Sequence, residues 1–114
     1  MDNARRATIR RAIEQAAELL KAHYQPERIV LFGSWAYGEP SADSDVDLLI
    51  IKKTDQPFHR RWAHVYRLVQ PVVKGIDFSP FVMTPEEIAQ GQRTHDPFLE
   101  EILTRGETLY AASG

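Results

Sequence analysis

The chain has 114 residues, a length typical of one domain, and 43% of them are hydrophobic while 26% are charged, which favours a soluble globular protein over a disordered or membrane one. Because it has no cysteine, disulfides and thiolate metal sites are excluded, and any metal must use oxygen or imidazole ligands. No apolar run approaches the ~18 residues of a membrane span, so we expect a cytoplasmic protein. The net charge of −2 does not favour binding to long nucleic acid.

The first half of the chain predicts a helix, a strand, a loop and a second strand. Apolar residues recur at steps of three and four from residue 4 to about residue 23, which indicates an amphipathic helix. The apolar run 29–32 predicts a buried strand. Small and polar residues over 33–44 predict a loop with a short helix near its start, and a second strand follows over 46–51.

A second helix is predicted from about residue 57 to residue 74. Its apolar stripe comprises Phe58, Trp62, Val65, Val69 and Val72. Residues 76–82 alternate and predict a third strand, with Ile76 and Phe78 on one face and Asp77 on the other.

The last third of the chain predicts two short helices and an extended tail. Thr84-Pro85-Glu86-Glu87 is a capping box that begins a helix towards Gln90. Asp96-Pro97 begins the last helix, which ends near Gly106 before a tail over 108–110. Its apolar residues are Phe98, Leu99, Ile102 and Leu103. The alternation predicts one α/β layer of three or four strands, and a single domain over residues 1–114.

Two aspartates at the beginning of the second predicted strand are the first candidates for chemistry. Asp45 and Asp47 are two residues apart, so the strand period points both carboxylates to the same side. Mg²⁺ is commonly held by one or two carboxylates together with substrate phosphates. Taken alone, such a pair more often marks a solvated strand end than a metal site.

A Gly-Ser turn directly upstream changes this interpretation. Where the first predicted strand ends at Gly33-Ser34, exposed backbone N–H groups and a helix start would favour phosphate binding. Gly33 and Gly38 have the glycine spacing of a P-loop, but Glu39-Pro40 stands where that motif requires Lys-Ser/Thr. The G-x-G-x-x-G dinucleotide motif is absent as well.

The two motifs together resemble a known signature. Gly33 to Gly38 and Ser44 to Leu48 are similar to the G-S-x-x-x-G and S-D-x-D-L motifs of DNA polymerase β-like nucleotidyltransferases, and the match is to the minimal bacterial and archaeal members. The resemblance covers nearly the whole chain. It implies a small mixed β sheet flanked by helices, the polymerase β-like nucleotidyltransferase fold.

The resemblance also implies a role for each motif residue. The Gly33-Ser34 turn, with Gly38, would hold a nucleoside triphosphate, and Ser44 would contribute to the nucleotide site. Asp45 and Asp47 would bind Mg²⁺, with two ions expected. A third carboxylate on a later strand completes the site in this family, and Asp77 fits that place. Asp77 would bind the metal ion nearer the acceptor and would either help to lower the pKa of the attacking hydroxyl or take its proton. The implied reaction is transfer of a nucleoside monophosphate, AMP from ATP, to a hydroxyl.

The acceptor is not determined by these residues, because they touch only the triphosphate and the attacking oxygen. Minimal members of the family often act as antitoxins that modify and neutralise a HEPN-domain ribonuclease encoded nearby, so a HEPN-domain toxin is the expected partner. Two alternatives stay open: a stand-alone transferase for a small hydroxylated molecule such as an aminoglycoside, and a module that blocks a partner without catalysis. The sequence does not determine the oligomeric state, and a homo-oligomer is one of the open alternatives.

Other polar and aromatic residues favour less specific roles. Solvated basic helix faces are expected at Arg5, Arg6, Arg10 and Arg11, and at His59, Arg60, Arg61, His64 and Arg67. Trp35 and Tyr37 could equally stack on a nucleobase or anchor the loop by packing.

Overall fold

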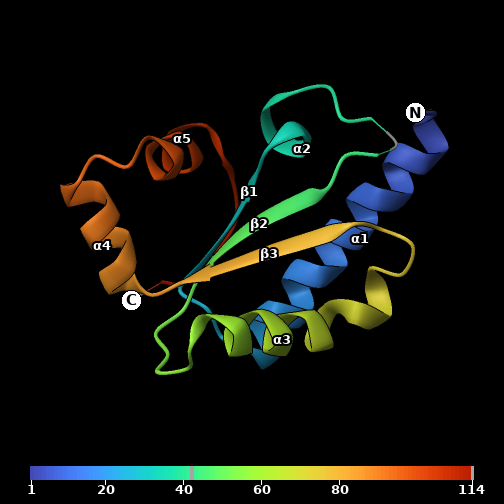
Figure 1. Ribbon diagram of the computed structural model, residues 1–114. Helices are drawn as coiled ribbons and strands as arrows, with labels where there is room; N and C mark the ends of the chain where they lie inside the picture. Colours follow the sequence, from blue (N-terminus) through green and yellow to red (C-terminus); the bar gives the residue numbers. More distant parts are fainter. Residues whose placement is uncertain (42, 114) are drawn as a thin grey trace.

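The computed structural model describes residues 1–41 and 43–113, which form one mixed four-stranded sheet covered by helices (Figure 1). The elements are α1 (Asn3–His23), β1 (Arg28–Phe32), α2 (Ser34–Tyr37), β2 (Val46–Ile51), α3 (Phe58–Val69), the 3₁₀ helix η1 (Gln70–Val72), β3 (Phe78–Met83), α4 (Pro85–Arg93), α5 (Pro97–Arg105) and β4 (Glu107–Ala111). The strand order is β3-β2-β1-β4. β1 runs antiparallel to both β2 and β4, and β2 runs parallel to β3. The predicted fold class, a mixed sheet flanked by helices, is confirmed.

The sheet has a hydrophobic core on each face. α1 and α3 cover one face, and α4 and α5 cover the other (Figure 1). Strand β2 lies in the middle, with Leu48 and Ile50 in the first core and Leu49 and Ile51 in the second. Since these four side chains are at most 8% exposed, β2 is a rigid support for the residues at its beginning.

Local sequence signals placed most element ends correctly. Asp2 caps α1 by accepting a hydrogen bond from the Arg5 N–H at 2.7 Å. The predicted capping box is present: the Thr84 hydroxyl accepts from the Glu87 N–H, and the Glu87 carboxylate accepts from the Thr84 N–H. No helix within 1–41 and 43–113 combines the length and the apolar character that crossing a membrane requires.

The predicted second helix is correct in position but ends earlier. α3 ends at Val69 and continues as the 3₁₀ helix η1, because Pro71 has no N–H for the next α-helical hydrogen bond. The tail predicted over 108–110 is part of β4, which pairs with β1 as the fourth strand of the sheet.

The predicted apolar stripes were wrong at three aromatic residues. Phe58, Trp62 and Phe98 are 51%, 46% and 52% exposed. Phe98 makes edge-on contacts with Phe32 and Phe81, and Phe58 makes one with Phe81. Phe58 and Phe98 therefore cover the border of the sheet, and Trp62 stacks on Tyr66 of its own helix.

Arg61 is buried, although the sequence predicted it on a solvated face. Its guanidinium donates to the Glu87 carboxylate at 2.7 Å and to the backbone oxygens of Gln56 and Val82 at 2.8 and 3.3 Å. The Val82 oxygen lies on the open edge of β3. Arg61 therefore satisfies one carbonyl oxygen of an edge strand, which would otherwise be free to accept a hydrogen bond from another chain.

Candidate active site

Four segments meet at one end of the sheet. The end of β1 leads through Gly33 into α2, and the loop before β2, the loop before β3 and the N-terminus of α1 lie at the same end (Figure 1). In the β1–β2 register Phe32 is opposite Asp47, which brings Asp47 beside the Gly33 turn. The structure therefore joins the two sequence motifs.

The third predicted carboxylate, Asp77, lies directly before the neighbouring strand β3, which begins at Phe78 rather than at the predicted residue 76. The β2–β3 register starts with the pair Val46 and Phe78, and the Val46 N–H donates to the Asp77 oxygen at 2.8 Å. The residues just before this pair, Asp45 and Asp77, are thus neighbours where the two parallel strands begin. Both side chains are exposed, as the predicted alternation of Asp77 with its buried neighbour Phe78 required.

Gly33 is required by its contact with Asp47. Its backbone has φ +75° and ψ −159°, a conformation that is adopted almost exclusively by glycine. A Cβ at this position would lie 2.4 Å from Asp47 Oδ2, far closer than any stable contact. The Asp47 carboxylate occupies the space that a side chain at position 33 would need. The glycine of the Gly-Ser motif therefore positions the aspartate of the Ser-Asp-x-Asp motif.

Asp47 lies in an environment that disfavours its own negative charge. Partial burial raises the pKa of its carboxyl above the ordinary value, and the negative charge of Asp45 raises it further. A bound cation would relieve both effects. The hard oxygen donors of Asp45 and Asp47 are the ligand type that Mg²⁺ prefers, so the pair fits a magnesium ion whose coordination is completed by phosphate oxygens and water.

Asp77 does not join these two in a three-carboxylate cluster. Within residues 1–41 and 43–113, no three Asp, Glu or His side chains are close enough together to hold one ion. The role of Asp77 as a metal ligand accordingly stays a prediction.

The predicted nucleotide-binding residues have different local roles. Ser34 begins α2 and is partly exposed beside the Gly33 turn. The Ser44 hydroxyl accepts from the Ser41 N–H at 2.8 Å and lies 3.2 Å from the Ser41 hydroxyl, so it closes the loop before β2. A Cβ at Gly38 would meet only ordinary contacts at 3.5 Å. Nucleotide contacts by Ser34, Gly38 and Ser44 stay predictions.

The two aromatic residues of the turn act as packing anchors. Trp35 is 8% exposed and belongs to the core under α1 and α3. Tyr37 packs against the other core, and the Arg105 guanidinium lies 4.4 Å from its ring centre. Of the two roles that the sequence left open, the structure supports local packing.

One contact near the site was missed by sequence reasoning. Arg5, predicted only on an exposed helix face, donates from Nη2 to the Gly75 backbone oxygen at 2.9 Å. This bond links the N-terminus of α1 to the loop that carries Asp77. The two residues are 70 positions apart, and no sequence spacing signals the contact.

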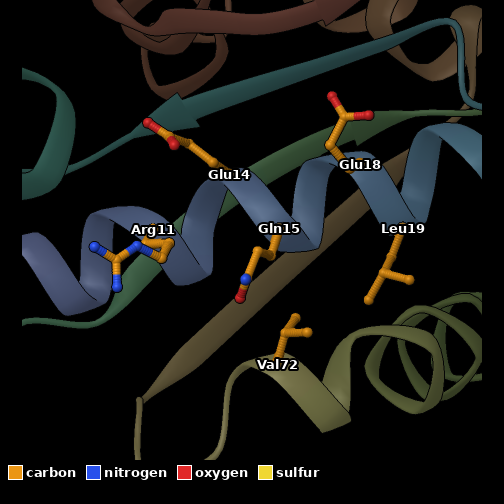
Figure 2. Close-up of a pocket in the computed structure, with 6 residues that line it drawn as sticks. All are labelled: Arg11, Glu14, Gln15, Glu18, Leu19 and Val72. Carbon is orange, nitrogen blue, oxygen red and sulfur yellow. The ribbon is translucent and has the colours of Figure 1, made fainter.

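A cavity of about 420 Å³ between α1 and η1 lies apart from the predicted site (Figure 2). Its lining residues are Arg11, Glu14, Gln15, Glu18, Leu19 and Val72. None of the predicted catalytic or nucleotide-binding residues is among them, so the candidate active site is the sheet end around Gly33 and Asp47.

Comparisons with known proteins identify the family of the chain. The family model described as "Polymerase beta, Nucleotidyltransferase" matches residues 14–113. "Putative protein adenylyltransferase MJ1379" of Methanocaldococcus jannaschii is 24% identical over 93 residues, which cover 82% of this chain and 85% of that protein. The crystal structure of a Sulfolobus solfataricus protein described as a putative nucleotidyltransferase has the same fold, with a TM-score of 0.54 at 21% identity over 79% of this chain and 81% of that one. Since the family model spans most of the sequence, the chain belongs to the polymerase β nucleotidyltransferase family.

Proposed function

We propose that this nucleotidyltransferase moves AMP from ATP to a hydroxyl on a partner protein in a Mg²⁺-dependent reaction, and that the partner is a HEPN-domain toxin that the transfer neutralises. The observation that supports the proposed catalysis is the close approach of Asp47 to Gly33. The backbone conformation of this turn is one that glycine adopts, and the pKa of the neighbouring Asp47 carboxyl is raised. Such an arrangement lowers the stability of the apoprotein and is useful once a cation and a phosphate chain are bound.

The transfer forms one bond and breaks one bond. The acceptor oxygen attacks the α-phosphorus of ATP, the bond from that phosphorus to the bridging oxygen breaks, and pyrophosphate leaves. The acceptor proton passes to the Asp77 carboxylate, which is exposed where β3 begins. Asp45 and Asp47 would hold Mg²⁺, which would supply positive charge to offset the negative charge that develops on the phosphate oxygens.

The protein acceptor is supported by a relative. The M. jannaschii protein is named a "Putative protein adenylyltransferase", and it matches this chain over most of both lengths. The HEPN-domain identity of the partner rests on the resemblance to minimal nucleotidyltransferases described above.

Co-expression with the protein encoded beside this chain tests the proposal. After affinity purification, intact-mass measurement should show the partner heavier by one or more AMP units with the native chain, and unmodified with Asp45→Asn. Stable association without a mass change in either case would instead favour a blocking module. Absence of association, together with modification of a small hydroxylated molecule, would contradict the protein acceptor.

A further inference from the structure

A hollow beside Asp77 provides space for the acceptor. It has a volume of about 420 Å³. It is lined by Tyr66, Gln70, Val73, Lys74, Gly75, Ile76 and Asp77. A hydroxyl that gives its proton to Asp77 must come within hydrogen-bond distance of that carboxylate, and a side chain inserted here would do so. Tyr66 is held as one wall by stacking on Trp62, with ring centres 5.0 Å apart and planes inclined by 20°.

A row of residues along α3 and the segments that flank it leads to this hollow. Its members are Gln56 before α3, Arg60, Ala63 and Arg67 on one face of α3, Gln70 in η1 and Lys74 after η1. The first four line a second hollow of about 430 Å³, together with His59 and His64, and the last two line the hollow beside Asp77. We call this row the α3 basic stripe.

The α3 basic stripe carries positive charge between two flanking acidic residues, Asp55 and Asp77. Residues 56–76 contain four of the chain's 14 lysines and arginines and none of its 16 acidic residues. Of the four cations, Arg61 is buried against Glu87. Among the residues that the structure describes, no carboxylate forms an ion pair with Arg60, Arg67 or Lys74.

We infer that the α3 basic stripe docks an acidic segment of the acceptor protein and directs a hydroxyl of that segment into the hollow beside Asp77. The inference rests on the proposed function, because it locates the acceptor of that reaction. The charge balance favours an acidic protein segment over a nucleic acid. The three cations of the stripe can match a short acidic segment, whereas a chain with a net charge of −2 lacks the overall basic charge that a long polyanion favours.

Charge reversal on the stripe tests the inference. The probes are synthetic peptides with one tyrosine flanked by glutamates, by lysines or by glutamines, incubated with the full chain, ATP and MgCl₂. For the native chain, kcat/KM should be highest with the glutamate peptide and should fall as salt is added. Arg67→Glu combined with Lys74→Glu should lower this kcat/KM by about tenfold or more and should raise that of the lysine peptide.

The control variant makes the same change of net charge elsewhere. Lys53→Glu combined with Arg93→Glu alters two exposed cations outside α3, in the segment after β2 and on α4. Its kcat/KM with the glutamate peptide should stay within about twofold of the native value, because distant exposed charges are screened. Equal thermal unfolding midpoints of both variants and the native chain would show that the charge changes leave the fold intact.

The outcomes separate the docking surface from the reaction itself. Equal modification of all three peptides, unchanged by either charge variant, would overturn the α3 docking surface and leave the protein adenylyltransferase reaction standing. Modification of an RNA 3′ hydroxyl, with all peptides unmodified, would overturn the acidic protein acceptor. If neither the peptides nor the co-expressed partner gained AMP while the chain still bound Mg²⁺ and ATP, the proposed function would fail, and this inference with it.

Discussion

Two carboxylates at opposite ends of the sheet have pKa values shifted in opposite directions. Glu87, beside the far end of β3, is disfavoured by burial, but hydrogen bonds from Arg61 and Thr84 together with the Arg61 charge outweigh that effect and lower its pKa. Asp47, at the beginning of β2, has burial and the Asp45 charge acting in the same direction, and its pKa is raised. Glu87 is paired within the chain, whereas Asp47 is the carboxylate that the proposed magnesium ion would neutralise.

The difference follows from what surrounds each group. Arg61 contacts Glu87, a strand-edge oxygen and a loop oxygen, so removing it would leave several polar groups unsatisfied. Asp47 instead packs against Gly33, which has no side chain to pair with the carboxylate. We therefore expect removal of the Asp45 and Asp47 charges to reduce activity with little loss of stability, and removal of Arg61 to do the reverse.

The largest effect is expected from removing the two carboxylates of the proposed magnesium site. Asp45→Asn combined with Asp47→Asn should lower nucleotidyl transfer by about 10³-fold or more, because a cation at this site is expected to contribute several kcal/mol of charge stabilisation. Transfer of label from α-labelled ATP measures the loss, and circular dichroism checks that the fold is kept. Native rates in this variant would remove Asp45 and Asp47 from the reaction.

A smaller but more diagnostic effect is expected from Gly33→Ala. The new Cβ would meet Asp47 Oδ2, and displacing that carboxylate should lower kcat/KM by about 10²-fold. The glycine-only backbone and the clash together should reduce the free energy of unfolding by about 2–3 kcal/mol. Urea denaturation measures the stability change.

A double-mutant cycle separates the clash from the backbone strain. Asp47→Ala removes Oδ2 and Cγ, after which the new Cβ at position 33 would keep only an ordinary 3.6 Å contact with the Asp47 Cβ. Gly33→Ala should then be about 1 kcal/mol less destabilising in the Asp47→Ala background than in the native one. Strict additivity would mean that Gly33 and Asp47 do not touch in solution.

At the other end of the sheet, Arg61→Met should reduce the free energy of unfolding without reducing the rate of nucleotidyl transfer by the folded protein. The loss should be about 2–3 kcal/mol, because a partly exposed Glu87 and two backbone oxygens lose their donor. Arg60→Met, on the exposed neighbour, should change the free energy of unfolding by no more than about 0.5 kcal/mol. Similar losses in the two variants would contradict the buried role of Arg61.

The same contact predicts a pH dependence of stability. Since the folded pKa of Glu87 is lowered, its contribution is fully present above the ordinary glutamate pKa and is lost as the pH falls through the lowered value. The difference in stability between the native chain and Arg61→Met should therefore shrink in acid. A difference that stayed constant or widened would show that the Arg61–Glu87 pair is not its source.

The sequence predicted those features that depend on neighbouring residues. The Thr84 capping box depends on residues three positions apart, and it is present as predicted. β2 was predicted with its observed bounds because an apolar run of that length is buried on both faces.

The features that sequence reasoning missed depend on residues distant in the chain. Arg61 resembles any other residue of a basic helix until Val82 and Glu87, more than 20 positions later, lie beside it. The exposed Phe58 and Phe98 contact Phe81 at the border of the sheet, which no helical period can reveal. Likewise, residues 108–110 could be predicted as extended, but their pairing with β1 depends on where α5 ends.

The smallest expected effect is a gain in stability from Asp47→Asn. Because the folded pKa of Asp47 is raised, the native state binds its proton more tightly than the unfolded state does, and ionising the group reduces the stability of the fold. This penalty is absent below the ordinary pKa of 3.8, grows as the pH rises through the raised value and is constant above it. Asn has nearly the same shape and no charge. Asp47→Asn should therefore raise the thermal midpoint slightly at neutral pH, with a difference that disappears in acid.

Magnesium turns this small gain into a test of the site. Added Mg²⁺ should stabilise the native chain by binding its two carboxylates and should stabilise Asp47→Asn much less, so the order of the two midpoints should reverse as the ion is titrated in. The matched control is Asp43→Asn, which removes an exposed carboxylate from the loop before β2. This variant should keep the native response to Mg²⁺. An equal response of all three proteins would mean that the carboxylate beside Gly33 does not bind the ion, and that the raised pKa of Asp47 is a consequence of packing alone.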